Sequence, residues 1–255
     1  MTEFLAAHTE DTFLGGQLRL RQLTSGHRAG HDAMLLAAGT SARAGERVVD
    51  LGAGVGAAGL ALARRVAGVT LVLVEIDQAL ADLARGNAAL NAIDADVHML
   101  DVEADAAAFA AAGLPPDSAD SVMMNPPFND AARHRASPDA ARAAAHVARE
   151  ATLQNWIHAA RRILKSGGAL TLIWRADGIA EVLSALDRGF GSLMIQPVHG
   201  EAGAPAIRIL VRAIKGGRGP TQFLLSLMLK DESGLPNKEV LEVLAGNGVL
   251  ALATR

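Results

Sequence analysis

The chain has 255 residues, of which 50% are hydrophobic and 20% are charged, so it is neither disordered nor collagen-like and can form one or two domains with a sizeable core. It contains no cysteine, which excludes disulfides, thiolate metal sites and a cysteine nucleophile and favours a reducing, cytoplasmic environment. Lys and Arg number 24 against 27 for Asp and Glu, a formal net charge of −3, so a polyanion would have to bind a local patch of the surface.

No targeting signal is expected from the first residues of the sequence. Its first ten residues are acidic and lack the basic and apolar regions of a signal peptide. The longest apolar runs, near 66–76 and 168–174, have the length of strands. Neither secretion nor membrane insertion is expected.

From about residue 46 to 175, short apolar runs alternate with longer helical patterns, which is typical of a parallel sheet covered by helices. The same pattern then gives a helix, two strands that should pair as an antiparallel edge, a further apolar run and a closing helix. Both tryptophans are expected in the core. The stretches 1–30, 129–150 and 198–221 are the least regular, so substrate contacts are expected there. The expected strands are 47–50, 69–74, 96–100, 122–124, 169–174, 193–197, 207–213 and a run over 223–229, and the expected helices are 57–67, about 80–90, 151–165, 179–186 and one from about 237.

A glycine-rich turn, with Gly52, Gly54 and Gly56, follows the first of these strands and opens a helix. Glycines in that context let backbone amides approach a ligand at a helix N-terminus. The letters also satisfy a dinucleotide fingerprint, Gly54-Val-Gly56-Ala-Ala-Gly59, which would suit a nicotinamide cofactor. Asp50 favours the other interpretation, because a carboxylate repels a pyrophosphate but suits the ammonium and sulfonium of S-adenosylmethionine.

Two further carboxylates end the next two strands. Glu75 can accept hydrogen bonds from both ribose hydroxyls of an adenosine, and Asp101 is placed to accept one from an adenine amine. The eight histidines show no spacing suited to a metal, so no metal site is expected.

The tetrapeptide Asn125-Pro126-Pro127-Phe128 ends the strand over 122–124, on the edge where open α/β sheets bind ligands. The prolines restrict the backbone, so the Asn125 amide oxygen and the Pro126 carbonyl form two fixed acceptors for an NH2 group. Phe128 offers a face on which a planar base or amide can stack. These four residues are the predicted catalytic residues, although Asn-Pro-Pro can also be a simple turn after a strand.

These features together resemble the class I S-adenosylmethionine-dependent methyltransferases over roughly residues 46–214. The resemblance implies an α/β fold, a Rossmann-like seven-stranded sheet with helices on both faces and one antiparallel strand, with the glycine turn under the methionine moiety. The tetrapeptide is similar to that of amino-methyltransferases, which modify adenine, guanine or cytosine amines or a glutamine amide.

The segment 1–45 is expected to be an N-terminal extension and 46–255 the methyltransferase domain. Asp32 can cap the helix that follows it. The Gly30-His-Asp32 segment before a Leu-Leu pair also resembles that of the bacterial tRNA adenine-N6 methyltransferases acting on valine tRNA, in which such an Asp helps to close the cofactor pocket. The match extends to 229–234, whereas His31 and the residues after Phe128 depart from that family's pattern.

Basic residues are candidates for phosphate contacts, although basic residues among alanines also form ordinary solvated faces. The expected function is methylation of an exocyclic amine, N6 of adenine in tRNA. A guanine-N2 rRNA or a protein glutamine methyltransferase, an NAD-dependent oxidoreductase and a non-catalytic RNA-binding module are the alternatives. The candidate RNA contacts are Arg133, Arg135 and Arg142 in the 129–150 insert, with Arg208, Arg212, Lys215 and Arg218 further along.

Overall fold

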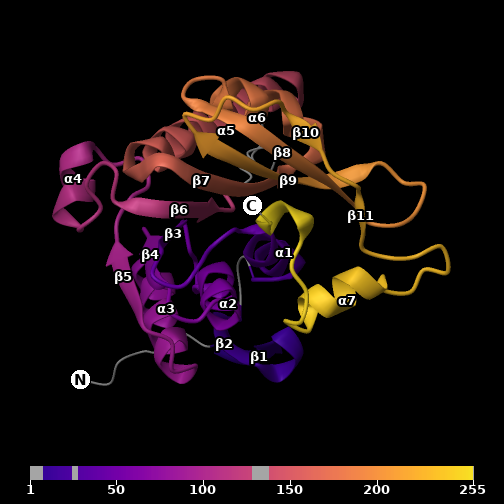
Figure 1. Cartoon of the computed structure of the whole chain (residues 1–255), viewed down its shortest axis with the longest axis horizontal. Coiled ribbons are helices and arrows are strands. Elements are labelled where there is room, and N and C mark those ends of the chain that lie inside the picture. The colour runs from indigo at the N-terminus through magenta and orange to yellow at the C-terminus, as the bar shows by residue number, and fades with distance from the viewer. Residues whose placement is uncertain (1–7, 25–27, 128–137, 255) are drawn as a thin grey trace.

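A central mixed sheet organises the protein (Figure 1). The computed structural model describes residues 8–24, 28–127 and 138–254, and for 138–150 the backbone alone. Within these residues the strand order is β10-β8-β9-β7-β6-β3-β4-β5, and β11 also pairs with β8. The strands are β3 (Arg47–Leu51), β4 (Thr70–Glu75), β5 (Ala95–Met99), β6 (Ala119–Met124), β7 (Leu164–Arg175), β8 (Phe190–His199), β9 (Ala206–Lys215), β10 (Gln222–Phe223) and β11 (Leu227–Met228).

The strand directions confirm the expected methyltransferase-like sheet. Strands β3 to β7 pair in parallel, and β9 is antiparallel to both β7 and β8. The path β5-β4-β3-β6-β7-β9-β8 is the predicted sheet of seven strands with one antiparallel member. The two-residue strands β10 and β11, both parallel to β8, replace the single run expected over 223–229. Parallel pairing brings the carboxyl ends of β3, β4 and β6 to one edge of the sheet.

Helices cover both faces of the sheet, which gives the core two layers (Figure 1). One layer packs α1, α2 and α3 with the face that includes Leu71 and Leu73, and the other packs α4, α5 and α6 with the face that includes Val72 and Val74. Successive strand residues point to opposite faces, so a strand buried on both sides is apolar throughout. The helices are α1 (His31–Gly39), α2 (Ala57–Arg65), α3 (Gln78–Leu90), α4 (Ala106–Ala111), α5 (Pro138–Ile163), α6 (Ile179–Leu186) and α7 (Lys238–Leu244).

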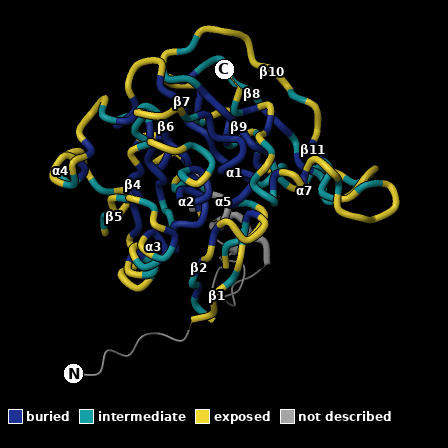
Figure 2. Tube along the Cα trace, turned by 60° about the horizontal axis from the view of Figure 1, so that its bottom comes forward, coloured by how far each residue is buried: buried dark blue, intermediate teal, exposed yellow. Residues whose placement is uncertain are grey.

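The burial pattern confirms that both tryptophans belong to the core. Trp156 in α5 and Trp174 in β7 are 9% and 1% exposed. Figure 2 shows the buried strands at the centre and the exposed connections around them. No described helix combines the length and apolarity needed to span a membrane.

An N-terminal hairpin corrects the expectation of an irregular stretch over 1–30. Strands β1 (His8–Phe13) and β2 (Leu18–Leu23) pair antiparallel. Leu18 and Leu20 are fully buried, while the side chains of Arg19 and Arg21 are 51% and 43% exposed. This alternation is the period of a half-buried strand and was visible in the sequence.

Two helical predictions were also incomplete. Helix α5 begins at Pro138, so the second half of the insert expected to be irregular is helical. Its alanine-rich sequence has a high helix propensity. Helix α4, which was not predicted, begins after Asp105, whose side chain caps it by accepting from Ala108 N. Gly168 lies within β7 rather than before it, and a Cβ there would lie 3.0 Å from the carbonyl oxygen of Asp120 in the neighbouring strand β6, so this close approach favours glycine.

Candidate functional site

The candidate site lies where three neighbouring strands end. β3 lies between β4 and β6, so the glycine turn after β3 has Glu75, the last residue of β4, on one side and Asn125, just after β6, on the other. Ligands of open α/β sheets bind at this edge. Asp50, Gly52, Gly54 and Asn125, all predicted from sequence, line one cavity.

The glycine turn requires glycine. The φ angles of Gly52, Gly54 and Gly56 are +70°, +58° and +84°, which L side chains adopt only with strain. A Cβ added at Gly54 would meet nothing within 4 Å, so its backbone is open to a ligand. At Gly52 the added Cβ would lie 2.3 Å from Cη2 of Trp156, so the indole on α5 packs directly against this glycine.

Glu75 fixes the turn from the neighbouring strand. Its Oε2 accepts from Gly54 N at 2.8 Å, and its Oε1 accepts from Ile76 N and Asp77 N, both at 2.9 Å. The carboxylate is only 6% exposed and is therefore a positioned acceptor rather than a mobile one. Ile76 beside it is 61% exposed, which leaves an apolar side chain at the rim of the site. Ile76 was not among the predicted site residues, although an apolar residue directly after the strand-ending acid was the available signal.

Asp50 is buried beneath the turn. It is 2% exposed, and its Oδ2 accepts from Gly59 N at 2.9 Å. Burial raises the pKa of this carboxyl to about 7, the Gly59 hydrogen bond opposes that rise, and the charge of Glu75 adds to it. A cation bound nearby would favour the charged carboxylate, whereas a pyrophosphate would disfavour it. The burial of Asp50 therefore leaves unchanged the predicted preference of this site for a cationic ligand over a pyrophosphate.

Asn125 carries an unused acceptor. Within the described part of the chain its Oδ1 is buried and has no hydrogen-bond partner. A buried amide oxygen left in this state costs free energy unless a ligand satisfies it. Pro126 is buried and Pro127 is exposed. Phe128 lies outside the described residues.

Glu75 and Gly56 belong to the turn and its support but are not among the residues that line the cavity, and the remaining predicted site residues do not line it either. Asp101 is exposed after β5 and its Oδ1 accepts from Glu103 N at 2.9 Å. Arg133 and Arg135 lie outside the described residues, and Arg142 belongs to α5 but its side chain is outside the description. No cluster of three or more His, Asp or Glu side chains suited to a metal occurs among the described residues.

Helix α1 and the residue before its N-cap reach the cavity through small and apolar side chains. Ala33 and Leu36 of α1 and Ala29 just before it line the cavity, whereas Asp32 accepts from Nε of Arg208 at 2.9 Å. The prediction that Asp32 caps this helix was wrong, because Gly30 is the N-cap and makes no side-chain cap. Asp32 lies inside the first turn, so its carboxylate is free to pair with β9 instead.

A pair of asparagines joins the N-terminal hairpin to the site. Asn87 on α3 accepts from Arg21 N at 2.7 Å and donates to Arg21 O at 3.0 Å, and Asn91 makes the same two contacts with Arg19 at 2.9 and 2.6 Å. Asn87 also donates to the carbonyl of Val55 in the glycine turn at 2.9 Å. The signal missed in the sequence was two asparagines four residues apart on an otherwise apolar helix face.

The prediction that Arg212 contacts phosphate, one of the candidates near 208–218, was wrong. It is 8% exposed, and its Nη1 donates to the carbonyls of Leu252 and Thr254 at 2.7 and 2.6 Å. This arginine therefore holds the C-terminal segment and is unavailable to RNA. The strand pattern of the sequence around Arg212 gave no sign of that role.

Comparison with known proteins supports a methyltransferase. The family model of the methyltransferase small domain matches residues 28–197, more than half of the chain. A predicted O-methyltransferase of Agrobacterium tumefaciens is 34% identical, with 86% of this chain and 98% of that chain covered and a TM-score of 0.72. No match was found among curated protein sequences.

Two more distant structures share the fold. The 16S rRNA N2 methyltransferase of T. thermophilus, in complex with AdoMet and guanosine, is 22% identical, with 82% of this chain and 50% of that chain covered and a TM-score of 0.55. TrmN from Thermus thermophilus is 20% identical, with 72% and 48% covered and a TM-score of 0.50. The chain belongs to the methyltransferase small domain family and is an S-adenosylmethionine-dependent methyltransferase.

Proposed function

We propose that this methyltransferase modifies an exocyclic amine, and that its substrate is N6 of an adenine in tRNA. The observation that carries the proposal is the buried, unpartnered Oδ1 of Asn125 in the cavity that also holds Asp50 and the glycine turn. An NH2 group is a donor of the kind that this acceptor lacks. A hydroxyl substrate could satisfy one acceptor, whereas an amine presents two protons, one for Asn125 and one for the Pro126 carbonyl.

The residues present fit the cofactor. Gly54 has open space above its backbone, Glu75 is a fixed acceptor whose Oε2, bonded among the described residues only to Gly54 N, can take a ribose hydroxyl, and the exposed Ile76 offers an apolar surface for a planar base. When bound, S-adenosylmethionine supplies an electrophilic methyl group on a sulfonium. We assign Asp50 to the favourable charge facing that cation. Asp32 and Asp101 stay candidates for contacts at the rim.

The tetrapeptide would act by positioning. An amine conjugated to a ring is a weak nucleophile because its lone pair is delocalised. Accepting its two protons at Asn125 Oδ1 and the Pro126 carbonyl favours a pyramidal nitrogen and directs the lone pair to the methyl group. Pro126 and Pro127 restrict the backbone, and Phe128 would stack on the base. No covalent intermediate with the protein is needed.

RNA is the substrate class favoured by the sequence and by one of the two distant structural neighbours. One neighbour is named as an rRNA N2 methyltransferase, and the N-terminal segment resembles tRNA adenine-N6 enzymes. We assign Arg133, Arg135 and Arg142 to phosphate contacts and place the enzyme in the cytoplasm, in tRNA processing. Methylation of guanine N2 in rRNA or of a protein glutamine amide is the second candidate, because Asn125 would receive those amines equally well.

The test is single-turnover methyl transfer from labelled donor to unfractionated tRNA, followed by mass spectrometry of the nucleosides. Asn125→Ala should bind S-adenosylhomocysteine as the wild type does yet lose on the order of 10²- to 10³-fold in rate, as when one positioned partner of a transition state is removed. Asn155→Ala is the matched control, since its amide lies on the surface of α5 and bonds to Glu103. A wild-type rate in Asn125→Ala would refute the mechanism, and a labelled oxygen would refute amine transfer.

A further inference from the structure

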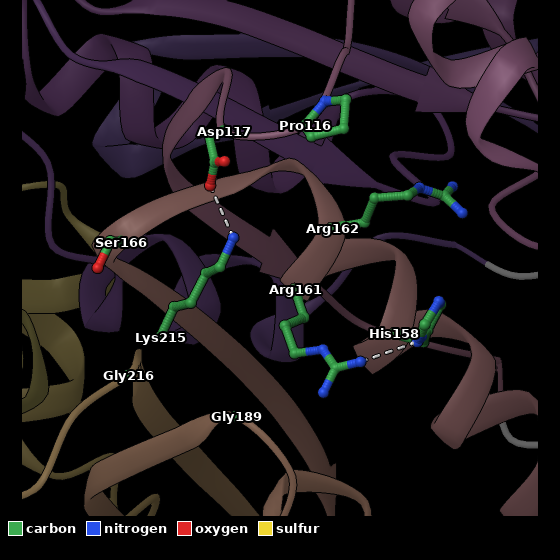
Figure 3. Close-up of a pocket in the computed structure, with 9 residues that line it drawn as sticks. All are labelled: Pro116, Asp117, His158, Arg161, Arg162, Ser166, Gly189, Lys215 and Gly216. Carbon is green, nitrogen blue, oxygen red and sulfur yellow. Dashed lines mark hydrogen bonds and ion pairs between the residues drawn. The ribbon is translucent and has the colours of Figure 1, made fainter.

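A second cavity lies at the edge of the sheet opposite to the cofactor site (Figure 3). Its volume is about 510 Å³, and it opens where β6, β7 and β8 begin and the antiparallel β9 ends. We call it the basic cleft and define it by Asp117, His158, Arg161, Arg162 and Lys215.

Arg161 is held in the cleft by contacts that do not cancel its charge. Nη1 donates to the carbonyl of Arg188 at 2.9 Å, and Nη2 lies 3.4 Å from Nδ1 of His158. Gly189 makes this placement possible, because a Cβ there would lie 2.7 Å from Cδ of Arg161. Among the described residues these contacts use two of the five N–H donors of the guanidinium, so others can bind an anion.

Lys215 lines the same cleft as Arg161, and Figure 3 shows its ammonium directed toward Asp117. Its Nζ donates to the carbonyl of Leu164 at 2.5 Å and to Oδ1 of Asp117 at 2.8 Å. Arg162 adds a third cation, with its guanidinium 4.5 Å from the ring centre of Phe109. Asp117 is the single carboxylate of this lining, and its side chain is 64% exposed.

The charge of the cleft contrasts with that of the chain. Three cations and one carboxylate line it, whereas the whole chain carries a formal −3. Arg161 and Arg162 each donate to a backbone carbonyl, of Arg188 at 2.9 Å and of Ala104 at 3.1 Å, which orients the side chain without neutralising it, whereas Lys215 is also paired with Asp117. Several such cations in one cleft attract multiply charged oxyanions, and phosphate is the common one.

We propose that the basic cleft binds backbone phosphates of the RNA substrate, away from the nucleotide that is methylated. This inference rests on the proposed function. β6 has six residues and joins the two edges, so the cleft lies roughly 20 Å from Asn125 at about 3.3 Å per residue. A short oligonucleotide in the active site would not reach it. A folded RNA such as tRNA would, so the cleft favours structured substrates over short strands.

Filter binding of unfractionated tRNA at several salt concentrations tests the proposal. Arg161→Gln with Lys215→Gln should bind tRNA about tenfold more weakly and make the slope of log K against log salt shallower by about 1 to 2. Arg85→Gln with Lys238→Gln, which removes two exposed cations from α3 and α7, is the control of equal charge. A short single-stranded RNA should show no difference between the double variants.

Asp117→Asn should change tRNA affinity in the opposite direction. Removing the exposed carboxylate should tighten tRNA binding severalfold, and thermal unfolding checks that each variant is folded. Binding of inorganic pyrophosphate is measured on the same variants. The proposal would be overturned if the cleft and control variants bound tRNA equally, or if the cleft variant lost binding of pyrophosphate but kept that of tRNA. Binding of tRNA that depends on the cleft but leads to no methylation would refute the proposed function while upholding the cleft, because binding is measured apart from transfer.

Discussion

The buried carboxyl of Asp50 should make stability depend on pH in a way that one substitution removes. Its pKa in the folded protein is about 7, against 3.8 for an ordinary Asp, because burial disfavours the charged form. Between these two values the folded state holds a proton that the unfolded state has lost. Stability therefore falls as pH rises from about 4 to 7, by about 1.4 kcal/mol per unit, and the total is on the order of 4 kcal/mol. Asp50→Asn keeps an oxygen for Gly59 N but has no charge to bury.

Urea unfolding of the cofactor-free wild type and of Asp50→Asn at several pH values measures this effect. Other titrating groups cancel in the difference between the two proteins. That difference should grow in favour of Asp50→Asn by about 2–3 kcal/mol from pH 5 to pH 8. Binding of the cationic cofactor should show the reverse, tightening in the wild type as pH rises through 7 and staying flat in Asp50→Asn. Parallel stability curves would show that the carboxyl titrates normally and would refute the reasoning.

Three other substitutions test the cradle around the cofactor. Glu75→Ala should weaken S-adenosylhomocysteine binding by about 1–3 kcal/mol and also lower stability, since three backbone amides lose their acceptor; calorimetry showing wild-type affinity would contradict this. Asn87→Ala should raise KM for the donor more than it lowers kcat, because the hairpin and the turn lose their shared link, and an unchanged KM would argue against that link. Gly52→Ala should destabilise by roughly 2–5 kcal/mol in urea unfolding, from positive φ plus the clash with Trp156, and a smaller loss would mean that the indole moves aside.

Much of the sheet and of the cradle could be predicted because local pattern and tertiary role agree there. The apolar run ending in Glu75 is buried on both faces, so its hydrophobicity alone defines a strand. The glycines have φ angles that other residues resist, which ties sequence to conformation directly. Asn125 could be placed because it follows a strand and precedes two prolines that fix the backbone.

The missed features depend on contacts between distant segments. Asn87 falls within the helix predicted over about 80–90, but its partner Arg21 lies 66 residues away. Asp32 resembled a helix cap, yet its partner Arg208 is 176 residues away in β9. Arg212 resembled a surface cation, but the chain end that covers it arrives 40 residues later. Periodicity and capping rules carry no information about such partners.

The attachment of β2 to α3 has a consequence for how this enzyme can vary. Both asparagines bond to main-chain N–H and C=O groups, so the side chains at positions 19 and 21 take no part in the attachment. Any residue with an amide hydrogen can occupy either position, and only proline is excluded. The outer face of the hairpin can therefore change its charge and shape between related enzymes while its backbone stays in place beside the glycine turn.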